Sequence, residues 1–420
     1  MRALTRVLER YISKGHFTLI DADGRHHTIA GEDVGLKAAV RMNSRLLPYK
    51  ILYDPELKMA EAYMDGELTM EPGTSLYDCL SVIMVNEGKI ANHPLHRLIH
   101  GFTEGHARRK QRLDLRRNKA QVRHHYDLSS ELYRLFLDPG MNYSCGYYRS
   151  ADESLVSAQN AKLNHIAAKL NLREGMKVLE IGGGWGSLAI RIAQCGCEVT
   201  VLNVSTEQIK IAKQRVKDAG LEGRVHFVCL DYNEFEGQFD RIVSVGMMEH
   251  VGIGNYEAYF AKVRDCLKED GSALIHSIGR NSPPGVTGPF LNKYIFPGGY
   301  CPSLSEVFSA SERQGLWVCD NEILRLHYHY TLRDWRRNFE QNRAQIAALY
   351  DERFCRMWEL YLTSVELGFK LGQLMVFQLI MSKKIDGVPI TRGFIEENER
   401  VLNQRFPVMV GQEEPRAATG

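Results

Sequence analysis

Residues 177–194 decide the fold, and they read KVLEIGGGWGSLAIRIAQ. The apolar run 177–181 predicts a buried strand, the glycines after it predict a tight turn, and 187–194 predicts a helix. Glycines are needed at such a turn when a cofactor approaches the backbone closely, because side chains would collide with it. The three pieces together predict a nucleotide-type cofactor site, with a purely structural turn as the alternative.

Strands and helices alternate on the carboxyl side of this turn. Further strands are predicted at 198–204, 225–230, 241–245 and 273–277, and helices at 207–219 and 256–267. The alternation predicts an α/β fold in which helices flank a mostly parallel sheet and ligands bind at the carboxyl ends of its strands. After Leu332 the pattern predicts helix almost throughout, including an apolar helix at 367–381.

The first hundred residues contain no nucleotide motif and predict a small accessory domain. Short strands are predicted at 17–20 and 50–53, separated from later segments by turn signals such as Asp65-Gly66. The predicted organisation is an accessory domain at 1–105, a basic linker at 106–123, a catalytic domain at 124–400 and a tail at 401–420.

The residues after the second strand indicate which cofactor binds. A nicotinamide dinucleotide calls for Asp or Glu about twenty residues beyond the glycine turn, but Asn203-Val204-Ser205 stands there. An acid, Asp231, follows the third strand, where it suits an adenine amino group. No second glycine pattern is present to cradle a pyrophosphate, which favours an adenosyl-sulfonium cofactor over a dinucleotide.

Five further motifs carry a resemblance to a known family. They are His124–Asp127, Leu137–Cys145, Gly246–Gly252, Lys293–Gly299, and His327-Tyr328 followed by Thr331-Leu332 and Trp335. In this order they resemble the cyclopropane-fatty-acyl-phospholipid synthases, and the mycolic acid cyclopropane synthases share many of them. The resemblance implies a Rossmann-like class I methyltransferase fold with helical lipid-binding additions and a small N-terminal α+β domain.

The resemblance also implies which residues surround S-adenosylmethionine. The matching positions are Tyr126, Tyr143, Ser144, Gly182, Gly184, Ser205, Gln208 and Asp231. Two departures stand out, because the family usually has Asp where this chain has Glu180 and Cys where it has Gly183. A carboxylate is kept in the first case and a smaller residue stands in the second, so binding is expected with a changed affinity.

Methyl transfer to an alkene leaves a carbocation, which must lose a proton from the new methyl group before a ring can close. The resemblance implies that a bound bicarbonate ion is the base. The matching positions are Cys145, Glu249, His276, Ile278 through its backbone, and Tyr328. Tyr328 and His276 are expected to donate hydrogen bonds to the anion, whereas Glu249 accepts the bicarbonate proton and orients His276.

Each of these residues also has an ordinary structural interpretation when it is taken alone. Cys145 suits a small buried position, Tyr328 a core position, and Glu249-His250 the start of a helix. Their joint appearance in family order favours the bicarbonate site over these structural roles. The place of His276 at the carboxyl end of a predicted strand supports a ligand-binding role independently. No His, Cys and carboxylate spacing predicts a metal site.

Charge and composition point to the partners. Residues 108–123 carry eight Lys and Arg and one acid, which predicts either a solvated linker or contact with anionic lipid headgroups. Nucleic acid is disfavoured because no aromatic residue is interleaved for base stacking.

Nine cysteines without a CxxC pair, together with the lack of an apolar leader, predict a cytoplasmic protein. No apolar run is suited to span a membrane, so peripheral contact with the inner membrane face is expected. The resemblance adds a homodimer as an expected assembly.

The leading hypothesis is cyclopropanation of unsaturated phospholipids. The same chemistry without ring closure would give methyl- or methylene-branched chains, and a non-catalytic lipid-binding protein is an alternative of another class. An apolar acyl-chain cleft is predicted from 290–296 and 367–381, with ordinary core packing as the alternative interpretation of that apolar stripe.

Overall fold

The computed structural model describes residues 1–87, 128–252 and 254–407. These residues form two compact units, each assembled from separate stretches of chain. The first unit draws on Met1–Leu128, Gly285–Gly299 and Leu332–Leu374, and the second on Ser129–Pro284, Tyr300–Thr331 and Met375–Gly420. The predicted domain boundaries stay predictions.

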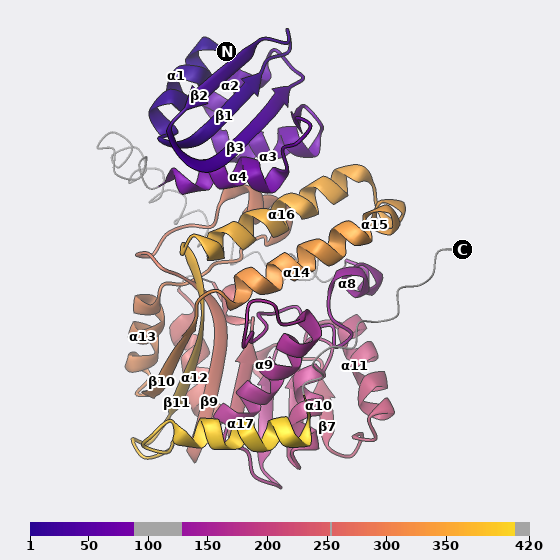
Figure 1. Cartoon of the computed structure of the whole chain (residues 1–420). Coiled ribbons are helices and arrows are strands. Elements are labelled where there is room, and N and C mark those ends of the chain that lie inside the picture. The colour runs from indigo at the N-terminus through magenta and orange to yellow at the C-terminus, as the bar shows by residue number, and fades with distance from the viewer. Residues whose placement is uncertain (88–127, 253, 408–420) are drawn as a thin grey trace. The chain divides into compact units, whose positions relative to one another are not determined.

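The first unit contains a four-stranded sheet in the order β2-β1-β3-β4 (Figure 1). Its strands are β1 (Lys14–Ile20), β2 (His26–Ala30), β3 (Glu32–Met42) and β4 (Leu68–Met70), and its first helices are α1 (Arg2–Tyr11), α2 (Leu47–Tyr53), α3 (Pro55–Met64) and α4 (Leu76–Val85). Inward residues of the strands pack with these helices around Phe17, Leu19 and Val40. The predicted strand at 17–20 is confirmed as part of β1.

The predicted strand at 50–53 is wrong, because these residues belong to the helix α2. Pro48 stands in the first turn of α2, where its missing N–H costs nothing. Leu47 and Ile51, four residues apart, are buried on one face of the helix. A seven-residue segment is too short for its period to separate a helix from a strand.

Three helices from later in the chain follow one another as α14 (His327–Gln341), α15 (Arg343–Leu349) and α16 (Glu352–Lys370). Within the first unit, α16 packs on α3 and α4. The hydroxyl of Tyr63 donates to Oε2 of Glu359 at 2.8 Å across this packing. The predicted helix around Phe354 and Trp358 is confirmed.

The second unit is built on a seven-stranded sheet in the order β10-β11-β9-β8-β5-β6-β7. The strands are β5 (Lys177–Ile181), β6 (Glu198–Leu202), β7 (Val225–Val228), β8 (Phe239–Val245), β9 (Leu267–Arg280), β10 (Trp317–Leu324) and β11 (Leu374–Ser382). The pairings β5-β6, β5-β8, β6-β7 and β8-β9 are parallel, whereas β10-β11 is antiparallel. The prediction of an α/β fold with a mostly parallel sheet is confirmed.

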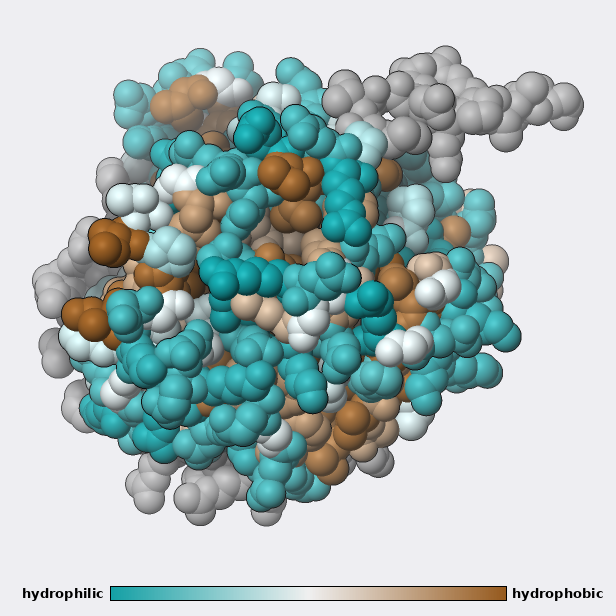
Figure 2. Space-filling view, turned by 90° about the horizontal axis from the view of Figure 1, so that it is seen from below, coloured by the Kyte–Doolittle hydropathy of each residue, from teal (hydrophilic) through white to brown (hydrophobic). Residues whose placement is uncertain are grey.

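Helices cover both faces of this sheet. One apolar layer joins the sheet to α12 (Tyr256–Cys266) and α13 (Leu304–Arg313). The other joins it to α9 (Leu155–Lys169), α10 (Ser187–Gln194), α11 (Thr206–Asp218) and α17 (Gly393–Arg405). Seen from the side of α17, most of the visible surface is hydrophilic, with apolar side chains scattered between (Figure 2).

The predicted helix at 367–381 is wrong in its second half. The helix α16 ends at Lys370, Gly372 adopts a left-handed φ of +76°, and the apolar run then forms β11. Phe377 packs in one apolar layer and Ile380 in the other. A strand that is buried on both faces shows no alternation, so its sequence resembles that of a buried helix. For β11 the core interpretation of the apolar stripe therefore holds.

No helix among residues 1–87, 128–252 and 254–407 is long and apolar enough to cross a membrane.

Candidate functional site

The glycine turn has the backbone that its sequence predicts. Gly182, Gly184 and Gly186 adopt φ values of +85°, +50° and +86°, which strain any residue with a side chain. Gly183 is constrained by space, since a Cβ there would lie 2.1 Å from Cγ1 of Val201. The turn thus exposes bare backbone between β5 and α10, as close approach by a cofactor requires.

Asn203 braces this turn from the end of β6. Its Nδ2 donates to the carbonyl oxygen of Gly184 at 3.1 Å and to Oε1 of Gln208 at 3.0 Å. Its Oδ1 accepts from the backbone N–H of Ser205 at 2.9 Å. Ser205 in turn caps α11 by accepting from the Gln208 N–H at 3.3 Å. Two predicted cofactor residues, Ser205 and Gln208, are therefore fixed beside the turn.

Asp231 follows β7, two strands away from the turn. It begins the short helix Tyr232–Glu234, and its Oδ1 accepts from the backbone N–H of Asn233 at 2.9 Å. The residue is only partly buried. Asp231 therefore stands at the carboxyl edge of the sheet, where a ligand can reach it.

Arg215, on α11, ties the turn to the segment 137–145. Its Nη1 donates to the carbonyl oxygens of Gly140 and Trp185 at 3.0 and 2.7 Å. The ring of Tyr143 lies edge-on to that of Tyr133, with centroids 5.2 Å apart, and Tyr133 contacts Trp185 at 4.9 Å. The predicted cofactor residues Tyr143 and Ser144 are thereby brought to the glycine turn.

Lys162 is a site residue that the sequence analysis missed. It lies on α9, is 3% exposed, and donates from Nζ to Oγ of Ser144 at 2.9 Å and to Oδ1 of Asn142 at 3.2 Å. Burial lowers the pKa of Lys162 to about 8, against the opposing charges of Asp138 and Glu180. The available signal was a lysine in a helical stretch that also contains Lys169, and sequence alone does not distinguish such a lysine from a surface lysine.

Glu180 faces the same region from β5. Its Oε2 is buried and has no hydrogen-bond partner among the residues that the structure describes. Burial raises the pKa of Glu180 to about 7, although the charge of Lys162 acts in the opposite direction. The carboxylate that replaces the family's usual Asp is therefore kept in the protein interior.

Glu249 and His276 are brought together by neighbouring parallel strands. Val245 of β8 pairs with His276 of β9, and the chain then turns through the short helix Met248–His250 that carries Glu249. The backbone N–H of Ile278 donates to Oε1 of Glu249 at 2.6 Å. The other oxygen, Oε2, is buried and lacks a partner within the described chain. Burial raises the pKa of Glu249 to about 7.

His276 is 3% exposed, and its partner is Gln378 on β11, with 3.1 Å between Nε2 of Gln378 and Nδ1 of His276. Among the described residues, Gln378 in the apolar run 367–381 therefore orients His276, and the expected orientation by Glu249 stays a prediction. Burial first, and then the charges of Lys162, Lys169 and His165, lower the pKa of His276 to about 3. The imidazole is therefore neutral at physiological pH.

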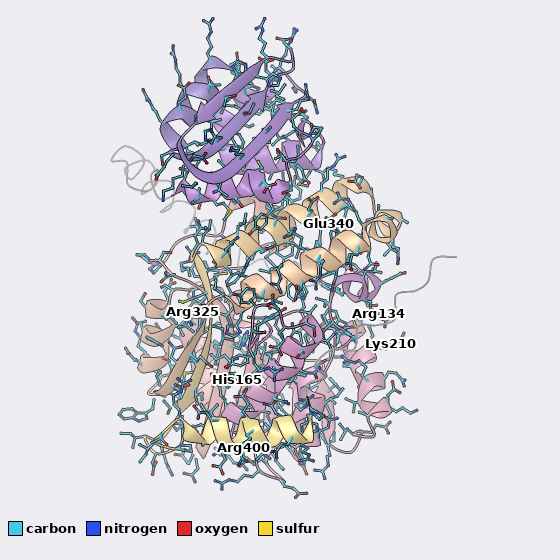
Figure 3. All side chains as sticks on the ribbon, viewed as in Figure 1. Arg134, His165, Lys210, Arg325, Glu340 and Arg400 are labelled. Atoms are coloured by element: carbon cyan, nitrogen blue, oxygen red, sulfur yellow. The ribbon has the colours of Figure 1, made fainter. Side chains whose placement is uncertain are left out.

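His165, on α9, belongs to a separate charged cluster. It lies between β10 and α17 (Figure 3), with Nε2 2.7 Å from Oε2 of Glu322 and Nδ1 3.5 Å from Oε1 of Glu399. Lys169 pairs with the same Glu322. These contacts hold positive charge in the interior of the unit, which contributes to the neutrality of His276.

Cys145 and Tyr328 come from two segments that are hydrogen-bonded to each other. The backbone N–H of Gly146 donates to Oγ1 of Thr331 at 3.0 Å, in the first turns of α14. Tyr328 lies in the same turns and is buried. Cys145 is fully buried, and burial raises the pKa of its thiol, so it is a neutral side chain here.

The described residues fit the two expected ligands. The bare turn suits an adenosyl cofactor, and the unpaired Oε2 of Glu249 is an acceptor that suits the hydroxyl of a bicarbonate ion. In residues 1–87, 128–252 and 254–407, no group of three or more His, Cys, Asp or Glu side chains is arranged to hold a metal. Tyr126 and the basic stretch 108–123 lie outside the described residues, and the ligand contacts of the other site residues stay predictions.

Comparisons with known proteins agree with this geometry. The sequence profile of the family described as "Mycolic acid cyclopropane synthetase" matches residues 113–379. The cyclopropane-fatty-acyl-phospholipid synthase of Escherichia coli K12 is 36% identical over 350 residues, which are 82% of this chain and 87% of that protein. A probable fatty acid methyltransferase of Pseudomonas putida is 39% identical over 279 residues, covering 64% of this chain and 71% of that one.

Solved structures show the same fold. The cyclopropane synthase MmaA2 of Mycobacterium tuberculosis superposes with a TM-score of 0.59 at 31% identity, over 62% of this chain and 96% of that one. The mycolic acid cyclopropane synthase CmaA1, crystallised with SAH and CTAB, gives the same TM-score at 33% identity over 62% and 97% of the two chains.

Proposed function

This chain belongs to the mycolic acid cyclopropane synthetase family, and on that premise we propose that it transfers a methylene group from S-adenosylmethionine to cis double bonds of phospholipid acyl chains. The products are cyclopropane fatty acyl chains, and bicarbonate is the proposed general base. The observation that carries the proposal is a buried carboxylate, Glu249, whose free oxygen lies at the carboxyl edge of the sheet next to the strand of the neutral His276.

The cofactor half of the site is proposed to use the residues around the glycine turn. Bound S-adenosylmethionine supplies an electrophilic methyl group. The backbone of Gly182 and Gly184 admits the cofactor, Ser205, Gln208 and Asp231 flank it on the sheet edge, and Tyr143 and Ser144 approach from the segment that Arg215 fixes. Tyr126 completes the proposed set.

The reaction needs a dry pocket and a proton acceptor. The new carbon–carbon bond forms as the carbon–sulfur bond breaks, and the resulting cation closes to a ring when the added methyl group gives up a proton. Bicarbonate, when bound, supplies the base. Glu249 is proposed to accept the hydroxyl proton of that anion, and His276, Tyr328 and the Ile278 backbone line its place, whereas the fully buried Cys145 helps to exclude water.

The lipid partner is proposed from the relatives and the charge pattern. The similarity to the E. coli phospholipid synthase covers 82% of this chain, whereas the structure of the mycolic acid enzyme CmaA1 covers 62% of it. Arg108–Arg123 is proposed to contact anionic headgroups from the cytoplasmic side, as a peripheral and reversible attachment of a homodimer.

Binding to anionic vesicles should then weaken as salt is added. This salt dependence should be stronger in the wild type than in a variant with neutral residues at Arg108, Arg109, Arg116 and Arg117. Unchanged sedimentation of that variant would make the stretch a linker.

A second candidate product is a branched chain. The P. putida relative is named a probable fatty acid methyltransferase, and a 40% identical protein of M. tuberculosis is named a tuberculostearic acid methyltransferase. Both names are consistent with a cation that does not close to a ring. A methylene-branched chain also requires loss of a proton from the cation, whereas ring closure requires that the proton leave the added methyl group, and we propose that the anion beside the free oxygen of Glu249 removes it there.

The deciding experiment incubates the purified protein with S-adenosylmethionine, bicarbonate and vesicles of a cis-monounsaturated phospholipid. The expected result is one added carbon by mass spectrometry, with the upfield proton resonances of a cyclopropane ring. One added carbon without ring protons supports the branched product. No added carbon on any unsaturated lipid overturns both candidates.

A further inference from the structure

Gln378 is a buried amide in a strand that is otherwise built of core residues. Its neighbours Phe377 and Leu379 pack in the apolar layer on one face of the sheet, and Gln378 itself is 0% exposed. Burial of an amide is unfavourable unless its groups are hydrogen-bonded. Its Oε1 has no partner within the described residues, so the contact between Nε2 and His276 is the polar contact that the structure gives this side chain.

This contact determines where the proton of His276 resides. An amide nitrogen donates and does not accept, so Nδ1 of His276 must accept from Nε2 of Gln378 and carries no proton. The imidazole is neutral, because burial and the nearby cations lower the pKa of His276 to about 3. Its single proton therefore resides on Nε2.

Glu249 and Gln378 lie on opposite sides of the strand that carries His276, and each has a different role. On the β8 side, Glu249 is fixed by the Ile278 amide and keeps one oxygen unpaired. On the β11 side, Gln378 holds Nδ1. An anion beside Glu249 needs a hydrogen-bond donor, and the opposite tautomer would present a lone pair of Nε2 to it.

We propose that Gln378 is a positioning residue that fixes the Nε2–H tautomer of His276 and so keeps this imidazole a hydrogen-bond donor to the anion of the site. The identity of that anion as bicarbonate rests on the proposed function. The tautomer itself does not, since it follows from the bond between the two side chains.

The test reads the tautomer directly by nitrogen NMR of the full-length protein labelled with ¹⁵N at its histidine rings. The His276 signals are assigned by their loss in His276→Asn. Wild-type protein should show a protonated Nε2 and an unprotonated Nδ1. Gln378→Glu should move the proton to Nδ1, because a carboxylate only accepts, and it should raise the pKa of the ring. Gln378→Met keeps the bulk without the donor and should give a mixture of tautomers.

Turnover provides the second measurement. Both variants should lose on the order of 10–100-fold in kcat, the usual cost of removing a group that orients a functional imidazole. S-adenosylmethionine affinity should stay at the wild-type value, and Gln404→Glu, an exposed change on α17, should leave turnover and tautomer unaltered. If Gln378→Glu does not fold, Gln378→Met gives the same two measurements.

The inference is overturned if wild-type His276 carries its proton on Nδ1, or if both variants keep the Nε2–H tautomer. Full turnover in both variants also overturns it. A wild-type protein that shows the expected tautomer but makes no cyclopropane refutes the proposed function and leaves the tautomer assignment supported, so the two failures are distinguishable.

Discussion

The backbone N–H of Ile278 donates to Oε1 of Glu249 at 2.6 Å, and this bond leaves Oε2 of the same carboxylate buried without a partner in the described chain. One oxygen anchors the side chain while the other stays available as an acceptor. A buried acceptor without a protein partner is costly to the fold, so this oxygen suits a ligand that donates a hydrogen bond to it.

Glu249→Gln should slow turnover with little change in cofactor affinity. The amide keeps the size of the side chain but lacks the negative acceptor for the anion's hydroxyl group. Loss of a group that supports proton removal commonly costs on the order of 10²–10⁴-fold in rate. Titration calorimetry with S-adenosylmethionine beside bicarbonate-dependent turnover separates the two roles. Cofactor binding that falls in proportion to activity would contradict the assignment.

The rate should rise with pH through about 7, because the pKa of Glu249 is raised to about 7 and only the ionised form accepts a proton. Profiles of kcat against pH, recorded at a fixed bicarbonate concentration, should show this rising limb in the wild type. Glu249→Gln should abolish it. The pKa of Glu180 is also raised to about 7, so Glu180→Gln is the control and should retain the limb. A limb that disappears with Glu180 instead would reassign the titration.

Lys162→Met should weaken cofactor binding through Ser144. The variant removes a buried charged donor 2.9 Å from Oγ of Ser144, an interaction worth about 1.5–3 kcal/mol and so on the order of 10–100-fold in affinity. Ser144→Ala breaks the same bond, and the double variant should cost less than the sum of the two. Lys210→Met, an exposed change on α11 (Figure 3), is the matched control. Additive losses would show that Lys162 and Ser144 act independently.

Gly183→Ala should destabilise the protein by about 1–3 kcal/mol, the usual cost of overpacking a core. The new Cβ would lie 2.1 Å from Cγ1 of Val201, so the strand β6 must shift. Val201→Ala removes that methyl group and should recover part of the loss, which urea unfolding of the two single variants and the double variant would measure. Equal effects of Gly183→Ala in both backgrounds would show that Val201 is not the obstacle.

Sequence predicted the central sheet well because its signal is local. The strand 177–181 and the helix 187–194 match β5 and α10 residue for residue, since a glycine turn separates two clear periodic patterns. The strand β11 was missed because a run buried on both faces has no alternation. Helix α2 was missed because seven residues contain too few turns of a helix to show a period.

The site shows the same division between local and distant information. Glu249 and the glycine turn belong to contiguous motifs, and His276 ends a predicted strand, so all three could be identified from sequence. Lys162 and Gln378 act on partners 18 and 102 residues away, and their roles depend on which strands and helices become neighbours. In the sequence, Gln378 is only a polar residue in an apolar run. Its contact with His276 can be recognised only when β11 is known to lie next to β9.

The packing of α16 on α3 and α4 also means that the first unit cannot be completed early in synthesis of the chain. Helix α4 ends at Val85 and α16 begins at Glu352, so the partner of α3 and α4 is translated about 270 residues later, roughly 15–50 s at usual elongation rates. During that interval the surface that α16 later covers, which includes the hydroxyl of Tyr63, has no permanent neighbour. The nascent chain should therefore recruit chaperones at its amino-terminal part, and release from them should coincide with the emergence of α16.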